Sequence, residues 1–282
     1  MDGAPPSAPW SPAAAVASPR EPHLSGPLAI LAHVEQVAPA SSGELVLARE
    51  GRTRGVVYVE HGRVCFAAAR GLGSRLADLL RTRARIEVTA RGMVELLRHG
   101  RDHDTPLGEL LVESGMMTPD GLMGALRRHT AESLVHIGAV PVTAWWIPRE
   151  RGGFQPRFTL SPVMLAPCVG ALLAGREPAA TLDPFARVQG AVAGGAFVRP
   201  ASETVPIAAA GMASVEALRR LGAQVTEALD VAGRIEGGPR FAFTGDQQGR
   251  GVLAWRDGEV IVGALIDDRA QLARCIGPLL AR

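Results

Sequence analysis

The last hundred residues carry a spacing of apolar residues that few folds can accommodate. Short apolar runs at 195–198 and 205–208 flank residues 199–204, where proline and polar residues predict the turn of a hairpin. Ser214 can then cap a helix, because a serine oxygen accepts from the free N–H groups at a helix start. Beyond it, apolar residues recur at steps of three and four, which places them on one helix face. These residues are Val215, Leu218, Leu221, Val225 and Leu229.

Three more apolar runs and a final helix complete this segment. Residues 241–243, 251–255 and 260–266 are predicted to be strands, and Asp257-Gly258 is a strong hairpin signal between the last two. Asp267 or Asp268 can cap the closing helix. The order is therefore two strands, a helix, three strands and a helix.

This order of elements, with these residues, resembles the Roadblock/LC7 family over about one third of the chain. The resemblance implies a five-stranded antiparallel sheet with flanking helices, no catalytic chemistry, and the binding or regulation of small Ras-like GTPases. Copies in that family pair through the central helix and the neighbouring middle strand, which match residues 214–231 and 240–244. We expect the apolar stripe to form the interface of a homodimer, and Arg219 and Arg220 to contact the partner.

The preceding part of the chain predicts a second antiparallel sheet. Residues 28–37 can form a short helix, and residues 43–48, 55–59 and 64–68 are predicted strands of a meander. The segments 42–45 and 55–67 resemble a PATAN or DUF4388-type domain of bacterial signalling proteins, with which no enzymatic activity is associated. Residues 142–147 and 154–159 are predicted to be a further pair of strands that closes this sheet.

A helical insert is predicted between these strands. Residues 106–114 start with a proline and are followed by Gly115, and Thr118 can cap the next helix. Residues 107–115 also resemble the N-terminal module of type II secretion ATPases, some of which bind cyclic di-GMP. Nucleotide-binding versions carry arginine before the Leu-Gly pair, where this chain has Thr105-Pro106. A two-helix packing unit is the alternative to a nucleotide site.

These observations predict an α+β protein with four segments. Residues 1–26 are a Pro/Ala-rich disordered tail, and 27–165 are the PATAN/DUF4388-like domain with its insert. Residues 166–182 are the linker, and 183–282 are the Roadblock/LC7-like domain.

Composition excludes several kinds of chemistry. The net charge is +2, and all 30 basic residues are arginines without a long cluster, so neither a nucleic-acid nor a membrane partner is predicted. The absence of lysine excludes a Walker A loop and a Schiff-base site. Three scattered cysteines fit a reducing, bacterial cytoplasm. His99 and His103 have a spacing that could bind zinc on a helix, and a solvated connector is the alternative.

The sequence therefore predicts no catalytic residue, no metal site and no cofactor. We expect a cytoplasmic signalling adaptor that forms a homodimer and binds or regulates a small GTPase. The rival hypothesis is a cyclic-dinucleotide-responsive receptor that uses the helical insert, and a third is an enzyme with an unrecognised site.

Overall fold

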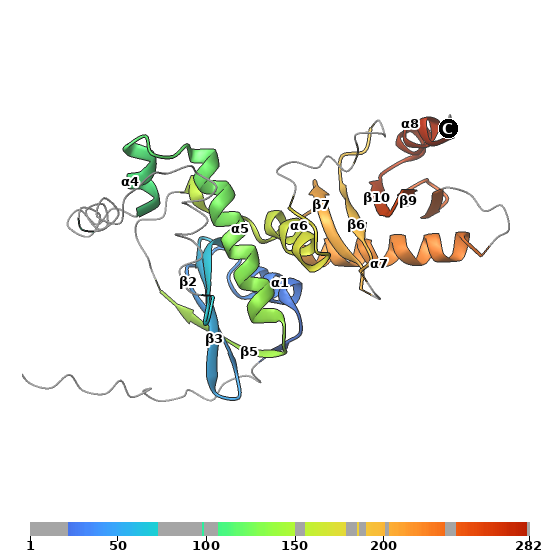
Figure 1. The fold of residues 1–282 in the computed structure, drawn as a ribbon. Coiled ribbons are helices and arrows are strands. Elements are labelled where there is room, and N and C mark those ends of the chain that lie inside the picture. Colours follow the sequence, from blue (N-terminus) through green and yellow to red (C-terminus); the bar gives the residue numbers. More distant parts are fainter. Residues whose placement is uncertain are drawn as a thin grey trace, which may run out of the picture.

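The protein contains two five-stranded antiparallel sheets with a layer of helices between them (Figure 1). The computed structural model describes residues 22–72, 98, 107–149, 156–178, 185, 190–200, 203–234 and 241–280. The predicted α+β class, with one sheet in each half of the chain, is confirmed.

The first sheet has the strand order β1-β5-β2-β3-β4. Strands β2 (Gly43–Arg49), β3 (Arg52–Glu60) and β4 (Arg63–Ala69) form the predicted meander, and β5 (Val142–Pro148) pairs with β2. The short strand β1 (His23–Leu24) pairs with β5 at the sheet edge. The folded part of the chain therefore begins before residue 27, earlier than the predicted end of the tail.

Helices cover one face of this sheet. Helix α1 (Pro27–Val37) and helix α5 (Pro119–Gly138) share a hydrophobic core with β2, β3 and β4, which contribute alternate residues such as Leu45, Leu47, Val57 and Val59. The predicted insert is present as α4 (Leu107–Glu113) and α5, and Thr118 caps α5 by accepting from the N–H of Gly121 at 3.1 Å. Helix α5, the second helix of the insert, is therefore part of the core of the first half of the chain.

The predicted strand at 154–159 is wrong where the structure describes it. Residues 156–158 form a 3-10 helix, Pro156–Phe158, and residues 154 and 155 lie outside the described residues. Pro156 has no backbone N–H that could donate a hydrogen bond to a neighbouring strand. The guanidinium of Arg63 donates to the hydroxyl and the carbonyl of Thr159 at 2.6 and 2.8 Å, which fixes the turn.

The predicted linker is also wrong over its first half. Residues 166–173 belong to helix α6 (Pro162–Leu173), which Ser161 caps by accepting from the N–H of Met164. This helix packs against α1 and α5 on one side, and against β7 (Val205–Ala210) and α7 (Val215–Ala232) on the other. The segment that we expected to separate the halves is one of the elements that join them.

The second sheet has the order β7-β6-β10-β9-β8. Its further strands are β6 (Gly194–Val198), β8 (Phe241–Gly245), β9 (Gly251–Asp257) and β10 (Val260–Ile266). Helix α7 lies on one face, and α8 (Arg269–Leu280) lies on the other (Figure 1). The predicted caps are present, since Ser214 accepts from the N–H of Ala217 and Asp268 accepts from that of Gln271.

Polar contacts cross between the two halves. The N–H of Val215, at the start of α7, donates to both carboxylate oxygens of Glu35 on α1 at 2.9 and 3.1 Å. A carboxylate is stabilised there by the positive end of the helix dipole. After α6, Arg176 pairs with Glu259 at 2.7 Å, and Glu177 pairs with Arg128 of α5 at 2.7 Å.

The contact at Glu35 predicts a pH dependence of stability. Burial raises the pKa of the Glu35 carboxyl above its ordinary value near 4.5, and the bond from Val215 opposes that shift. The folded chain holds this proton more tightly than the unfolded chain, so this contribution to stability is present below the ordinary pKa. It is lost as the pH rises through the raised pKa. Glu35→Gln should remove this pH-dependent contribution to the free energy of unfolding.

The measurement is urea unfolding of wild type and Glu35→Gln from about pH 4 to pH 7. We expect the stability of the wild type, relative to the variant, to fall as the pH rises. Glu50→Gln removes a carboxyl that is 80% exposed and is the control for loss of one charge. A difference that stays constant or grows with pH would contradict the assignment.

Candidate interaction surface

The apolar stripe of α7 lies inside its own chain, so the prediction that it forms the dimer interface is wrong. Each side chain of the stripe is at most 5% exposed and belongs to the core shared with the two sheets. The periodicity identified the apolar face correctly, but the sheet beneath α7 already covers it. Any surface for a second chain must lie elsewhere on this half. The side chains concerned are Val215, Leu218, Leu221, Val225 and Leu229.

The free edges of the two sheets are the other sites where a second chain can add, because an edge strand offers unpaired N–H and C=O groups. In the first sheet, edge strand β1 has only two residues. Edge strand β4 exchanges two backbone hydrogen bonds of 2.8 Å between Val64 and Leu160. In the second sheet, edge strand β7 is packed against α6. Three of the four edges are therefore short or partly covered.

Strand β8 is the exception among the described residues. It pairs with β9 on one side, and no strand that the structure describes pairs with its second side. Its residues, Phe241 to Gly245, include neither a proline nor a charged side chain. Proline and charge are the usual devices that keep an edge strand from pairing with another chain. β8 is thus open to such pairing.

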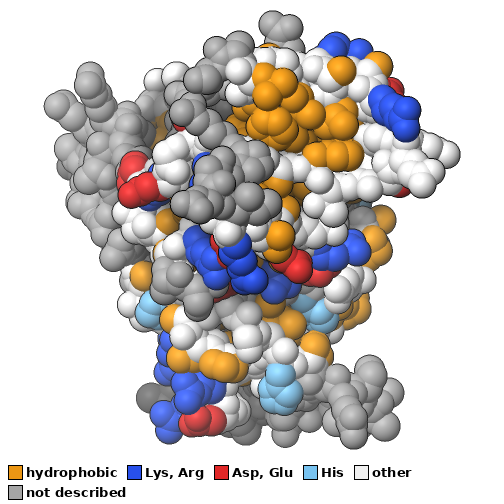
Figure 2. All heavy atoms as spheres, turned by 90° about the vertical axis from the view of Figure 1, so that its right-hand side faces the viewer, with side chains coloured by type: hydrophobic (Ala, Val, Ile, Leu, Met, Phe, Trp, Pro, Cys, Tyr) orange, Lys and Arg blue, Asp and Glu red, His pale blue; other side chains and the backbone are white. Residues whose placement is uncertain are grey.

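A groove of about 810 Å³ follows this edge, between β8 and the C-terminal half of α7. Ala242 and Val252 line it from the face of the sheet that packs against α7, and Val231 of α7 also lines it with 56% of its surface exposed. Figure 2 views the end of the molecule that holds the second sheet, and hydrophobic side chains gather there in one area of the upper surface. An open strand edge and an apolar hollow therefore adjoin.

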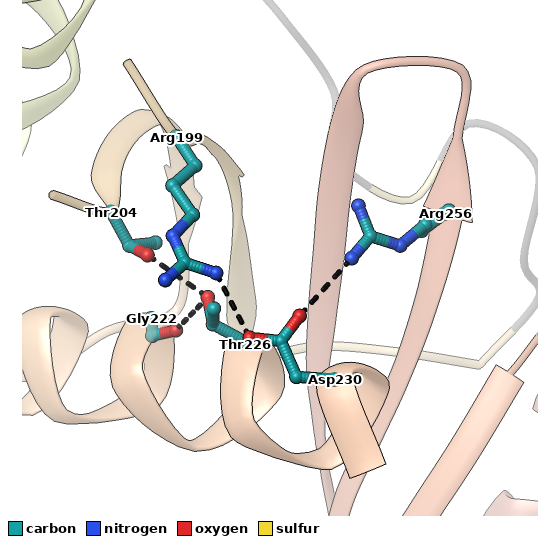
Figure 3. Close-up of polar contacts among 6 residues, drawn as sticks. All are labelled: Arg199, Thr204, Gly222, Thr226, Asp230 and Arg256. Atoms are coloured by element: carbon teal, nitrogen blue, oxygen red, sulfur yellow. Dashed lines mark hydrogen bonds and ion pairs between the residues drawn. The ribbon is translucent and has the colours of Figure 1, made fainter. Parts of the chain in front are cut away.

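A polar cluster fixes the end of α7 that forms this groove (Figure 3). Asp230 accepts from Arg199, which follows β6, at 2.9 Å, and it pairs with Arg256 of β9 at 3.5 Å. One turn earlier, the buried Thr226 hydroxyl donates to the carbonyl of Gly222 and lies 3.0 Å from the hydroxyl of Thr204. Two separate hairpins are thereby joined to the last turns of the helix.

A smaller hollow of about 450 Å³ lies beside this cluster and shares Glu227 and Val231 with the groove. Its lining carries both signs of charge, with Arg199 and Arg234 facing Glu227 and Asp230. The arginines are favourable beside the negative C-terminal end of α7, and the pairs that Arg199 and Arg256 form with Asp230 hold that end against the sheet.

The predicted partner contacts lie on the exposed side of α7. Arg219 pairs with Glu216 at 3.1 Å, one turn earlier, and both side chains are nearly half exposed. Arg220 is exposed next to it. These two arginines are accessible to a partner, and their role stays a prediction.

The described residues offer little for catalysis. No group of three His, Cys, Asp or Glu side chains within them could hold a metal ion, and His99 and His103 lie outside the described residues. Cys65, Cys168 and Cys275 are buried, and burial raises the pKa of the Cys168 thiol to about 11. Such a thiol is not a nucleophile at neutral pH.

The helical insert was the candidate site for a cyclic dinucleotide. His129 on α5 is buried, and burial lowers its pKa even though Glu132 opposes the shift. This histidine is therefore a packed neutral residue. The residue pair Thr105-Pro106 lies outside the described residues.

Within the part of the chain that the structure describes, no helix has the length and apolar character needed to cross a membrane. Comparisons with protein-family models, with curated proteins and with solved structures found no match. The three family resemblances therefore stay predictions.

The polar cluster predicts a small, salt-dependent contribution to stability. Asp230→Asn keeps the size of the side chain and removes the charge that Arg199 and Arg256 share. Because these ion pairs are 41–50% exposed, the loss should be below about 1 kcal/mol and should shrink at high salt. Thermal unfolding at low and high salt measures it, with Glu216→Gln as the control for an isolated surface pair. An equal loss at both salt concentrations would contradict an electrostatic role.

Proposed function

We propose that this protein is a non-enzymatic signalling adaptor of the bacterial cytoplasm. It forms a homodimer through β8 and the outer side of α7, and it binds a small Ras-like GTPase and regulates it by contact. The observation that carries the dimer is the open edge of β8 beside an apolar groove. An edge strand gains main-chain hydrogen bonds when a second strand adds to it, and the groove supplies pockets for side chains.

A second copy is a better occupant than an unrelated strand, because the surface is complementary to itself. Val231 projects at the rim of the same groove that could receive an apolar side chain. In a two-fold dimer, each copy can place its Val231 against the groove of the other while the two β8 strands pair antiparallel. One interface then satisfies both open edges and covers both grooves.

The GTPase part of the proposal is supported by the element order that the Roadblock/LC7 resemblance rests on. A five-stranded antiparallel sheet with helices on its faces is the layout that this resemblance implies, and the second half of the chain has it. Arg219 and Arg220 lie on the exposed side of α7, where they remain accessible when its apolar face is buried. A protein without a catalytic group must act on a GTPase through contact.

The dimer is tested by the mass of the full chain in solution. Wild type at tens of micromolar should give the mass of two chains by light scattering. Val231→Arg should give the mass of one, because a desolvated, unpaired charge at the groove opposes burial. Met164→Arg is the matched control, since Met164 is 58% exposed on α6, and it should stay a dimer. Dimers of undiminished affinity in Val231→Arg would place the interface elsewhere, and a monomeric wild type would remove it.

The partner is tested with purified Ras-like GTPases loaded with GDP or with a non-hydrolysable GTP analogue. We expect binding to prefer one nucleotide state, because a ligand shifts an equilibrium only through its different affinities for the two states. Arg220→Glu should weaken that binding at least several-fold, whereas Arg52→Glu, the same charge change on an exposed residue of β3, should not. Equal or absent binding in both states for every GTPase tested would eliminate this part of the proposal.

A further inference from the structure

The two ends of the second sheet differ in a way that decides how copies can assemble. At one end, β8 is open within the described residues. At the other end, β7 lies against α6, and the approach is so close that a Cβ on Gly170 would lie 1.8 Å from the carbonyl oxygen of Pro206. No side chain fits between this helix and this edge strand. Gly170 is therefore required by the contact itself.

Two other features of β7 also disfavour pairing with another strand. Pro206 within the strand has no N–H to donate. The pairing of β7 with β6 shifts register between Ala196 and Phe197, as a bulge does. Bulges, prolines and covering helices are the recognised means of blocking an edge. Pro206 and the bulge affect the first half of β7, so the rest of the strand could still pair with another chain if α6 did not pack against it. β8 has neither a proline nor a charge.

The number of open ends sets the kind of assembly. A sheet with two open ends can add copies head to tail without limit, which produces fibres. A sheet with one open end can pair only with the same end of a second copy, and the result is closed. We propose that α6 is an internal plug on β7, so that self-association through β8 stops at two chains. This inference rests on the proposed dimer for its β8 side.

The plug is held from both halves of the chain. Helix α6 packs on α1 and α5, and the residues after it are fixed by the pairs Arg176–Glu259 and Glu177–Arg128. The first half of the chain therefore has an assembly role, since it keeps α6 on β7. Separating the halves would expose a second edge and convert a closed pair into a growing one.

Hydrogen exchange of the intact protein tests the plug without altering it. In Val231→Arg, which leaves β8 unpaired, peptides from β7 should exchange slowly and peptides from β8 should exchange fast. In wild type the β8 peptides should become protected as the concentration rises, whereas protection of β7 should not change. Exchange of β7 as fast as that of β8 in Val231→Arg would overturn the inference.

A second arm removes the plug. Gly170→Leu should push α6 from β7, and its mass should rise beyond two chains with concentration. Gly124→Leu is the matched control, because nothing lies within 4 Å of a Cβ on this glycine of α5, and it should stay a dimer. Circular dichroism checks that both variants are folded. If Gly170→Leu does not fold, the exchange experiment alone decides.

The double variant Gly170→Leu/Val231→Arg separates the two proposals. It should self-associate through β7 although β8 is blocked. A monomeric wild type together with an associating Gly170→Leu would refute the β8 dimer and leave the plug standing. A folded Gly170→Leu that stays at two chains at every concentration would refute the plug and leave the dimer standing.

Discussion

The approach of α6 to β7 is the contact on which the arrangement of this protein depends. A helix can lie directly on an edge strand only where its side chains do not intervene, and Gly170 provides that position. Once α6 is fixed there, its other sides bury apolar surface of α1, α5 and α7, and a single hydrophobic cluster includes residues of both halves. The two sheets are thus parts of one packed body, and the polar contacts of Glu35 and Arg176 lie at its margin.

Helix α7 shows how one element can serve the core and still leave a surface for a partner. Its apolar stripe is covered by its own sheet. Val231, two residues after the last residue of the stripe, remains exposed at the groove. Burial of an apolar side chain contributes about 1.5–3 kcal/mol, so the five residues of the stripe cannot be spared for an interface without unfolding this half. The surface that we propose for association is the border where α7 meets β8.

Most elements could be predicted from the sequence, because their apolar residues repeat with a period of two or near 3.6. The meander of the first sheet, the hairpin at Asp257-Gly258 and the caps at Thr118, Ser214 and Asp268 are confirmed in this way. The residues of α6 from 166 onward were assigned to a linker, because nearly all residues of this helix are apolar and no polar face shows which of its sides is buried. Its two sides are buried by different halves of the chain.

The candidate site was harder to predict than the fold for a related reason. Periodicity shows which face of α7 is apolar, but the partner of that face depends on the sheet, whose strands are distant in sequence. The open edge of β8 had a visible signal, since residues 241–245 lack proline and charge. The covered state of β7 had only a partial signal in Pro206, because the covering helix comes from a region more than thirty residues earlier.

A rigid junction also limits how the proposed adaptor can transmit a signal. A partner bound at α7 can affect the first half only by favouring one of two arrangements of the packed helices, since close-packed interfaces do not deform gradually. Helix α6 touches elements of both halves, namely α1, α5, α7 and β7, and its contact with β7 leaves no space for small adjustments. A change at either half therefore either leaves α6 in place or releases it as a unit. Release of α6 from β7 is therefore the step through which the proposed binding of a partner at one half and the proposed pairing of chains through the other can be coupled.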